Sequence, residues 1–458
     1  MILSLRRRRA SRRPSNTNTQ ISDSDSGMEI VIPNHFRCPI SLDLMKDPVT
    51  LLTGITYDRE SIEKWIEAGN QTCPVTNQVL NSFDQIPNHS IRRMIQDWCV
   101  QNRSHGIERI PTPRIPVAPF EVSAICEKIA VATRRGDRKR CQDLVAKIKV
   151  WGKESERDRR CIVKSGAGCV LSLSFESFAR RYDVVSNAEE SSVLLLDQIL
   201  SVLTWAFDPS DGEAQAQLGS DSSLRCLVSF LGGNDLSARQ NAVLVLKTLL
   251  SSDQRHVVAA NLAEIEGALE GLVGIIRQPV SPKATKASLT VIFHMVSDNS
   301  HSQNDINKIG SRFLDLGLVS LLLENVLDGE KSLSERALRV LDVICDCKEG
   351  REKAYENALT TPLLVKKILR ISDMATEILV SILWKLCKNS SNEEKESVLV
   401  EALQVGAFQK LLLLLQMGTC SERMKEKVTQ LLKLFNLHRR GLDCVDSSGD
   451  FKYLKKPF

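Results

Sequence analysis

One apolar segment recurs at a nearly constant interval, and this repeat restricts the fold more than any other feature of the chain. The copies begin at Leu227, Leu272, Leu318 and Leu364, which are 45, 46 and 46 residues apart, and a looser copy begins at Ala407. Each is followed by a second predicted amphipathic helix, over Ala238–Leu250, Ala284–Val296, Leu333–Cys345, Met374–Cys387 and Glu422–Phe435. A repeat of this length cannot bury its apolar face alone, so neighbouring repeats stack into a solenoid whose concave surface binds protein segments.

Residues 33–105 have the outline of a RING-type cross-brace but lack its zinc ligands. Cys38-Pro39 recurs 35 positions later as Cys73-Pro74. Zinc gathers about four Cys or His ligands per ion, usually in closely spaced pairs. The only Cys and His residues here, none of them paired at ligand spacing, are Cys38, Cys73, Cys99, His35, His89 and His105. The sequence therefore predicts no metal and no cofactor, and the ligand count argues against a zinc-dependent RING ligase.

The same segment resembles U-box domains, which keep the RING outline without zinc. The matching stretches are Phe36–Leu42, Met45–Val49, Gly54–Arg59, Ile62–Trp65, Cys73–Thr76 and Ile86–Asn88. The repeats resemble the armadillo arrays that are attached to U-boxes in plants. The resemblance implies an E3 ubiquitin-protein ligase that recruits a ubiquitin-conjugating enzyme. The expected fold is mainly α: a small zinc-free α+β U-box, followed by an all-α armadillo-type superhelical solenoid.

Local signals inside the U-box predict a hairpin and two helices. β-Branched and aromatic residues on either side of Thr53-Gly54 indicate a hairpin over residues 49–57. Asp58 is expected to cap a helix with Ile62, Trp65 and Ile66 on one face, and Gly69 to end it. Asn88 is expected to cap the last helix.

The resemblance also assigns a surface for the conjugating enzyme. It implies a shallow groove made by Ile40 of the first loop and Pro74 of the second, with Leu42 and Trp65 beside them. Val49 and Leu42 are expected to pack inside, and Ile40 and Pro74 to face solvent. Ordinary core packing remains the alternative for Ile40 and for Trp65.

Asn77 occupies the position at which many U-boxes and RINGs place a side chain that holds the conjugating enzyme's ubiquitin thioester in its reactive form. Arginine is frequent there, and asparagine lacks its charge and reach. A plain turn residue is the alternative. No covalent catalysis is expected, because Cys38 and Cys73 have no neighbouring base in sequence and are better explained as small buried thiols.

Five segments follow from these signals: a basic tail over 1–30 that is expected to be disordered, the U-box over 31–105, a proline-rich linker over 106–120, armadillo-like repeats over 121–440, and a tail over 441–458. The net charge of +5 comes from the first segment. Six of the 61 basic residues lie in residues 1–20, which leaves 55 basic against 56 acidic residues, or −1. A neutral body argues against nucleic-acid binding.

The 13 cysteines, with no secretory signal, favour a reducing compartment. No apolar stretch approaches the roughly 18 residues of a membrane span. We expect a cytoplasmic protein, and the arginine run adds nuclear import as an alternative to a plain solvated tail.

Two functions remain after these exclusions. The first is a ligase whose U-box docks a ubiquitin-charged conjugating enzyme while the repeats hold a protein target, in plant defence or stress signalling as the resemblance implies. The second is a non-catalytic scaffold whose U-box only dimerises or docks. Nuclear import receptors are disfavoured, because their Trp-x-x-x-Asn ladder is absent: Trp205 is followed at that spacing by Pro209, and Trp384 by Lys388.

Overall fold

The computed structural model describes residues 32–110, 117–184, 190–252, 255–297, 303–388, 392–417 and 421–439. The chain divides into two compact units, Met1–Ile115 and Pro116–Phe458. The predicted tails over 1–30 and 441–458 lie outside the described residues.

The first unit is a small sheet packed with two helices. Its elements are η1 (Asn34–Phe36), β1 (Pro48–Thr50), β2 (Thr56–Asp58), α1 (Arg59–Glu67), β3 (Ile86–Pro87), α2 (His89–Gln101) and η2 (Arg103–His105). The strands form an antiparallel sheet of order β2-β1-β3. The predicted hairpin is confirmed, with Val49 paired to Tyr57 across a turn at Gly54. The third strand was not predicted.

Both predicted helices of this unit are present, and one cap differs. Asn88 caps α2, because its side chain accepts a hydrogen bond from the Ile91 amide. Asp58 stands at the N-cap of α1, but its side chain makes no capping bond. Its carboxylate instead accepts hydrogen bonds from the Lys46 and Asp47 amides. Among the described residues, a core of twelve buried side chains, including Tyr57 and Ile62, connects these elements.

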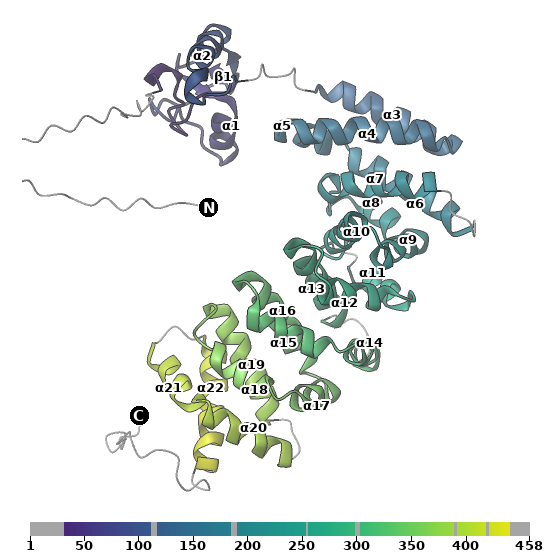
Figure 1. Ribbon diagram of the computed structural model, residues 1–458, viewed down its shortest axis with the longest axis vertical. Helices are drawn as coiled ribbons and strands as arrows, with labels where there is room; N and C mark the ends of the chain where they lie inside the picture. The colour runs from purple at the N-terminus through teal and green to yellow at the C-terminus, as the bar shows by residue number, and fades with distance from the viewer. Residues whose placement is uncertain are drawn as a thin grey trace, which may run out of the picture. The chain divides into compact units, whose positions relative to one another are not determined.

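The second unit is a continuous stack of helices (Figure 1). It begins with α3 (Pro119–Arg135), α4 (Arg138–Glu154), α5 (Glu156–Lys164), α6 (Ala167–Val184) and α7 (Glu190–Ala206). The first of these starts at Pro119, inside the segment predicted as linker. A single apolar core runs through the stack from Val122 to Phe435.

The repeated segment and the helix predicted after it are both confirmed. The repeated segments form α9 (Asp221–Gly232), α12 (Ala268–Arg277), α15 (Leu318–Asp328), α18 (Thr360–Lys367) and α21 (Ala407–Met417). The helices predicted to follow are α10 (Leu236–Leu249), α13 (Pro282–Val296), α16 (Lys331–Ile344), α19 (Asp373–Lys388) and α22 (Glu422–Arg439). Helices of this second set contact each other from repeat to repeat, as an armadillo array requires.

A third helix in each repeat was not predicted. These helices are α8 (Gly212–Leu218), α11 (Arg255–Glu264), α14 (Gln303–Asp315), α17 (Lys348–Glu356) and α20 (Asn392–Gln404). Most are short, and α17 has a polar sequence interrupted by Gly350. Such segments are marginal as isolated helices, and here they pack against neighbouring helices, as α8 does against α6 and α14 against α17.

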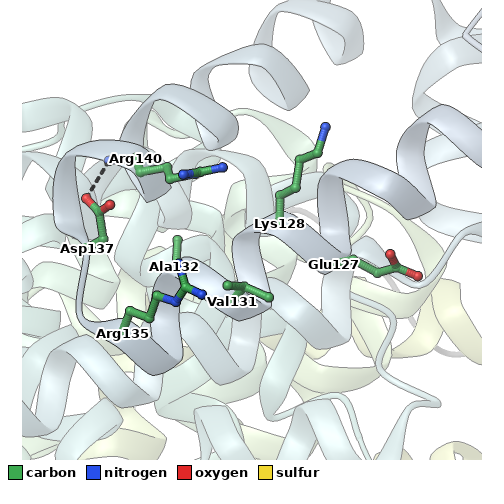
Figure 2. Close-up of a pocket in the computed structure, with 7 residues that line it drawn as sticks. All are labelled: Glu127, Lys128, Val131, Ala132, Arg135, Asp137 and Arg140. Atoms are coloured by element: carbon green, nitrogen blue, oxygen red, sulfur yellow. Dashed lines mark hydrogen bonds between the residues drawn. The ribbon is translucent and has the colours of Figure 1, made fainter.

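A hollow of about 190 Å³ opens beside the turn that joins α3 to α4 (Figure 2). It is lined mainly by charged side chains, and we return to it below.

Candidate functional site

Two loops of the first unit have the same backbone conformation. They are Cys38–Leu42 and Cys73–Asn77. The Leu42 amide donates to the Cys38 carbonyl at 2.8 Å, and the Asn77 amide donates to the Cys73 carbonyl at 2.9 Å. Leu42 and Asn77 both have a left-handed backbone, with φ of 62° and 55°. The two loops therefore repeat one local structure within this unit.

This match identifies a residue that the sequence reasoning missed. Position by position, Ile40 of the first loop corresponds to Val75 of the second, with Pro74 matching Pro39. The Val75 side chain is 51% exposed. The repeated pattern of Cys, Pro, β-branched aliphatic and hydroxyl residue was visible in the sequence and would have revealed Val75.

The predicted orientations are only partly right. Val49 is fully buried, as expected. Leu42 was expected inside but is 69% exposed, because the left-handed backbone turns its side chain outward at the end of the loop. Ile40 and Pro74 were expected to face solvent but are half-buried, and Ile40 packs against the core. An exposed leucine beside a half-buried isoleucine forms an apolar surface that no described residue covers.

Trp65 joins α1 to the second loop. Its indole nitrogen donates a hydrogen bond to the Thr72 carbonyl at 2.8 Å, and its ring is half-buried against the core. The Asn70 side chain donates to the Trp65 carbonyl at 3.0 Å and so fixes the end of the helix. Trp65 thus has a structural role and also leaves part of its ring at the surface.

Asn77 is exposed, and its side-chain amide forms no hydrogen bond to any residue within the described ranges. Its amide keeps both a donor and an acceptor for a partner. Asparagine also tolerates the left-handed backbone at this position better than most residues do. The same side chain therefore suits the turn and a contact.

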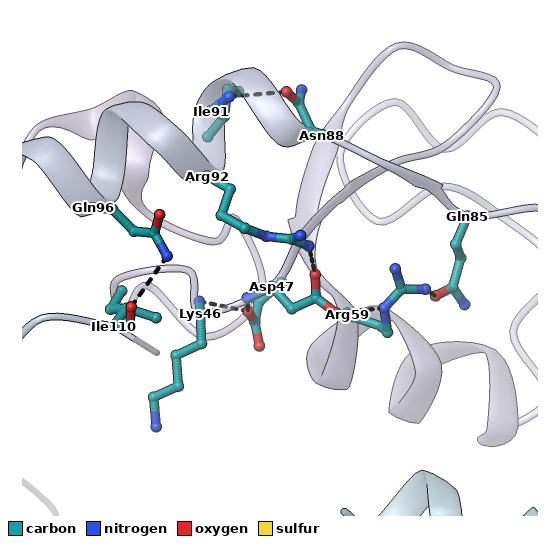
Figure 3. A network of polar contacts seen from close by, with 10 residues as sticks. Lys46, Asp47, Arg59, Gln85, Asn88, Ile91, Arg92, Gln96 and Ile110 are labelled. Atoms are coloured by element: carbon teal, nitrogen blue, oxygen red, sulfur yellow. Dashed lines mark hydrogen bonds and ion pairs between the residues drawn. The ribbon is translucent and has the colours of Figure 1, made fainter. Parts of the chain in front are cut away.

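Carboxylates hold residues 46–47, which lead from the first loop into β1, in place (Figure 3). One oxygen of Asp58 accepts hydrogen bonds from the Lys46 and Asp47 amides, at 2.8 and 2.9 Å, which explains why Asp58 does not cap α1. Asp47 is paired with Arg59 of α1, at 2.7 Å, and with Arg92 of α2. These bonds join residues 46–47 to both helices, and the residues that the structure describes include no group of side chains suited to hold a metal.

Two family models cover most of the chain. Residues 32–104 match the U-box domain, and residues 121–455 match the plant U-box protein ARM repeat region. The chain belongs to the plant U-box/armadillo-repeat family of E3 ubiquitin-protein ligases. This U-box ligase is accordingly a ubiquitin transferase of the RING type.

Relatives from Arabidopsis thaliana share both halves of this U-box ligase. U-box domain-containing protein 21 is 47% identical over 95% of each chain, and U-box domain-containing protein 20 is 47% identical over the full length of both. E3 ubiquitin-protein ligase PUB22 is 32% identical over 91% of this chain and 97% of its own.

The two loop cysteines of the U-box ligase are buried hydrogen-bond acceptors. Cys38 sulfur accepts from the Asp58 amide at 3.3 Å, and Cys73 sulfur lies 3.0 Å from the Tyr57 hydroxyl. Burial opposes ionisation of the Cys73 thiol, but hydrogen bonds from Thr53, Thr76 and Tyr57 outweigh it and lower its pKa to about 6. Neither sulfur is exposed, so the predicted burial is confirmed. The lowered pKa of Cys73 favours its thiolate near neutral pH, which the sequence did not indicate.

We expect the U-box to become more stable as the pH rises from about 6 to about 8.5. In that window the folded Cys73 has lost its proton, whereas an unfolded cysteine, with a pKa of about 8.5, still holds one. The gain is at most about 1.4 kcal/mol per pH unit, and it disappears below pH 6. Urea unfolding of residues 30–105 across this range measures it, with Cys73→Ser as the comparison. Parallel curves for the two proteins would contradict the assignment.

Among the described residues, no single helix is long and apolar enough to cross a membrane. Only the bent pair Ser397–Gln404 and Ala407–Met417, which meet at 71°, passes that test together.

Proposed function

We propose that the U-box binds a ubiquitin-charged conjugating enzyme through Ile40, Leu42, Trp65 and Pro74. Val75, which corresponds to Ile40 in the second loop, is proposed to contact the enzyme too. The observation that supports this most directly is the exposure of apolar side chains on two loops of the same backbone conformation. Leu42 and Val75 expose apolar surface to water there, which costs free energy. A partner that covers these side chains offsets that cost. Interfaces of this kind depend on a few apolar contacts at their centre.

Asn77 is proposed to position ubiquitin after the conjugating enzyme has bound. Its free amide stands at the end of the second loop, beside the proposed groove. One hydrogen bond from it to the enzyme or to ubiquitin would favour the reactive arrangement of the thioester. No residue of this chain bonds covalently to ubiquitin in this mechanism. The rate gain comes from holding the thioester and a target lysine together.

The armadillo repeats are proposed to hold the protein target, because a stack of this kind presents a long continuous surface. We further propose a cytoplasmic protein that the arginine run also brings to the nucleus, acting in plant defence or stress signalling. The alternative is a non-catalytic scaffold with a U-box that only docks or dimerises. A docking-only U-box would be expected to have polar residues at these groove positions. This chain has Ile40 and Pro74 there, which argues against the alternative.

Separating the two halves should separate the two activities. Residues 30–105 alone should accelerate the release of ubiquitin from a charged conjugating enzyme to free lysine, because proximity is the whole contribution of the U-box. Residues 121–440 alone should accelerate nothing. Asn77→Ala should slow the release by several-fold without weakening binding of the uncharged enzyme. A gel-based discharge assay and a calorimetric titration measure the two quantities.

The outcome distinguishes the ligase from the scaffold. An isolated U-box that binds conjugating enzymes but accelerates none of a broad panel would support the scaffold. Gln78→Ala is a suitable control for Asn77→Ala, since it also alters an exposed polar side chain, directly after the same loop. Light scattering of the same fragment tests the dimer.

A further inference from the structure

The hollow beside the α3–α4 turn is lined by cations that no described acidic group neutralises (Figure 2). Lys128 and Arg135 come from α3, and Arg140 comes from the first turn of α4. All three side chains are exposed, and none forms an ion pair with another residue in the part of the chain that the structure describes. The acidic residues of the lining are Glu127, at one end, and Asp137.

Asp137 is already used by the fold. Its carboxylate accepts a hydrogen bond from the Arg140 amide and so caps α4. Positive charge is dense around this turn: five of the seven residues from 134 to 140 are basic. The hollow therefore has a strong excess of positive charge, with Arg140 and Arg135 on either side of it (Figure 2).

Part of this charge is placed where it destabilises the helix. The first turn of a helix carries the positive end of its dipole, where acidic residues are favourable and basic ones are not. The first turn of α4 contains no acidic residue and holds Arg138, Lys139 and Arg140. Asp137 at the N-cap offsets part of this repulsion through its bond to the Arg140 amide, and a bound anion would offset more of it.

A third helix, α6, brings one more cation to the turn. Gly136 has a left-handed backbone, with φ of 70°, and a side chain there would come within 2.1 Å of an Arg181 nitrogen. Arg181 of α6 thus packs directly on the glycine of the turn, and its guanidinium also lies 5.9 Å from the Phe178 ring. The left-handed backbone favours glycine at this position, whereas the end of the Arg181 side chain could move aside for a larger residue.

We propose that this hollow binds a phosphorylated segment of a partner protein. Two guanidinium groups and an ammonium match the several oxygens and the charge of about −1.5 to −2 of a phosphoserine better than they match one carboxylate. The exposed Val131 and the buried Ala132 form an apolar wall that suits a neighbouring aliphatic side chain of the same segment. The identification of the partner as a protein rests on the proposed target-binding role of the array.

Fluorescence anisotropy with the full-length chain tests the site. The probe is a labelled peptide that contains one phosphoserine with an aspartate on each side, and one leucine. The control peptide has an unmodified serine in place of the phosphoserine. The phosphorylated form should bind at least about tenfold more tightly. Arg135→Gln together with Arg140→Gln should weaken it about a hundredfold, since each guanidinium forms charge-assisted hydrogen bonds. Arg370→Gln with Arg423→Gln is the matched control, which removes two exposed arginines elsewhere on the array.

Stability gives an independent readout. In buffer without phosphate or sulfate, Arg140→Gln should raise the melting temperature by about 1–2 °C, because it removes a cation from the positive end of α4. A merely structural arginine would lower it. Inorganic phosphate should then raise the melting temperature of the unmodified chain more than that of the variant.

Three results would overturn the proposal: equal affinity for the two peptides, unchanged binding by the double variant, or preference for vesicles containing phosphoinositides over the peptide. Ubiquitin discharge to free lysine by the double variant should equal that of the unmodified chain. The U-box function and this site can therefore fail separately.

Discussion

Replacing Ile40 with alanine should reduce ubiquitin discharge by the full-length chain at least about thirtyfold. Ile40 is the middle residue of the first loop, and removing a central apolar contact of a small interface typically costs about 2 kcal/mol of binding free energy. The side chain is half-buried, so the free energy of unfolding of the U-box should fall too, by about 1 kcal/mol, which is less than for a fully buried isoleucine. Single-turnover discharge and urea unfolding measure the two effects.

The balance between these two effects decides the role of Ile40. Val100→Ala is the matched control, because Val100 is an aliphatic residue of α2 that is 55% exposed. It should leave both discharge and stability nearly unchanged. A loss of unfolding free energy above about 3 kcal/mol for Ile40→Ala would show that this residue is core, and the proposed interface would lose its central contact. Leu42→Ala then becomes the cleaner probe, since its side chain is 69% exposed and adds little to the core.

Features fixed by nearby residues were predictable from the sequence. The hairpin depends on Gly54 between two β-branched runs, and the cap of α2 depends on Asn88 three residues before the amide that it accepts from. The repeated helices were predictable because their apolar faces recur at one interval. In each case the residues that determine the conformation are close together in sequence or repeated along it.

Features fixed by distant residues were not predictable in the same way. Asp58 looks like a helix cap, but the amides of Lys46 and Asp47 compete for its carboxylate across eleven or twelve positions. Leu42 looks like core by its side chain, but a loop that places it in a left-handed conformation turns it toward solvent. The polar contacts that replace zinc are likewise long-range, and Arg92 lies 45 positions from Asp47.

Removing the charge of Asp47 should unfold the U-box more effectively than any metal chelator. Asp47→Asn leaves Arg59 and Arg92 without their counterion. Water cannot replace it well, because the two arginine side chains are only 16% and 13% exposed. Unpairing charges of low exposure costs about 3 kcal/mol, which is most of the stability that a small domain has. Circular dichroism of residues 30–105 should therefore show a large loss of folded protein at 37 °C, and ubiquitin discharge should fall with it.

The effect belongs to the ion-pair network and not to negative charge in general. Asp97→Asn removes an exposed carboxylate of α2 and should change the stability little. The double variant Asp47→Asn with Arg92→Gln should lose less unfolding free energy than the sum of the two single variants. The reason is that removing both partners leaves fewer unpaired charges than removing one. Overnight treatment with EDTA should leave the unmodified U-box folded and active. If EDTA unfolds it while Asp47→Asn does not, a structural metal holds this unit, and the carboxylate network is secondary.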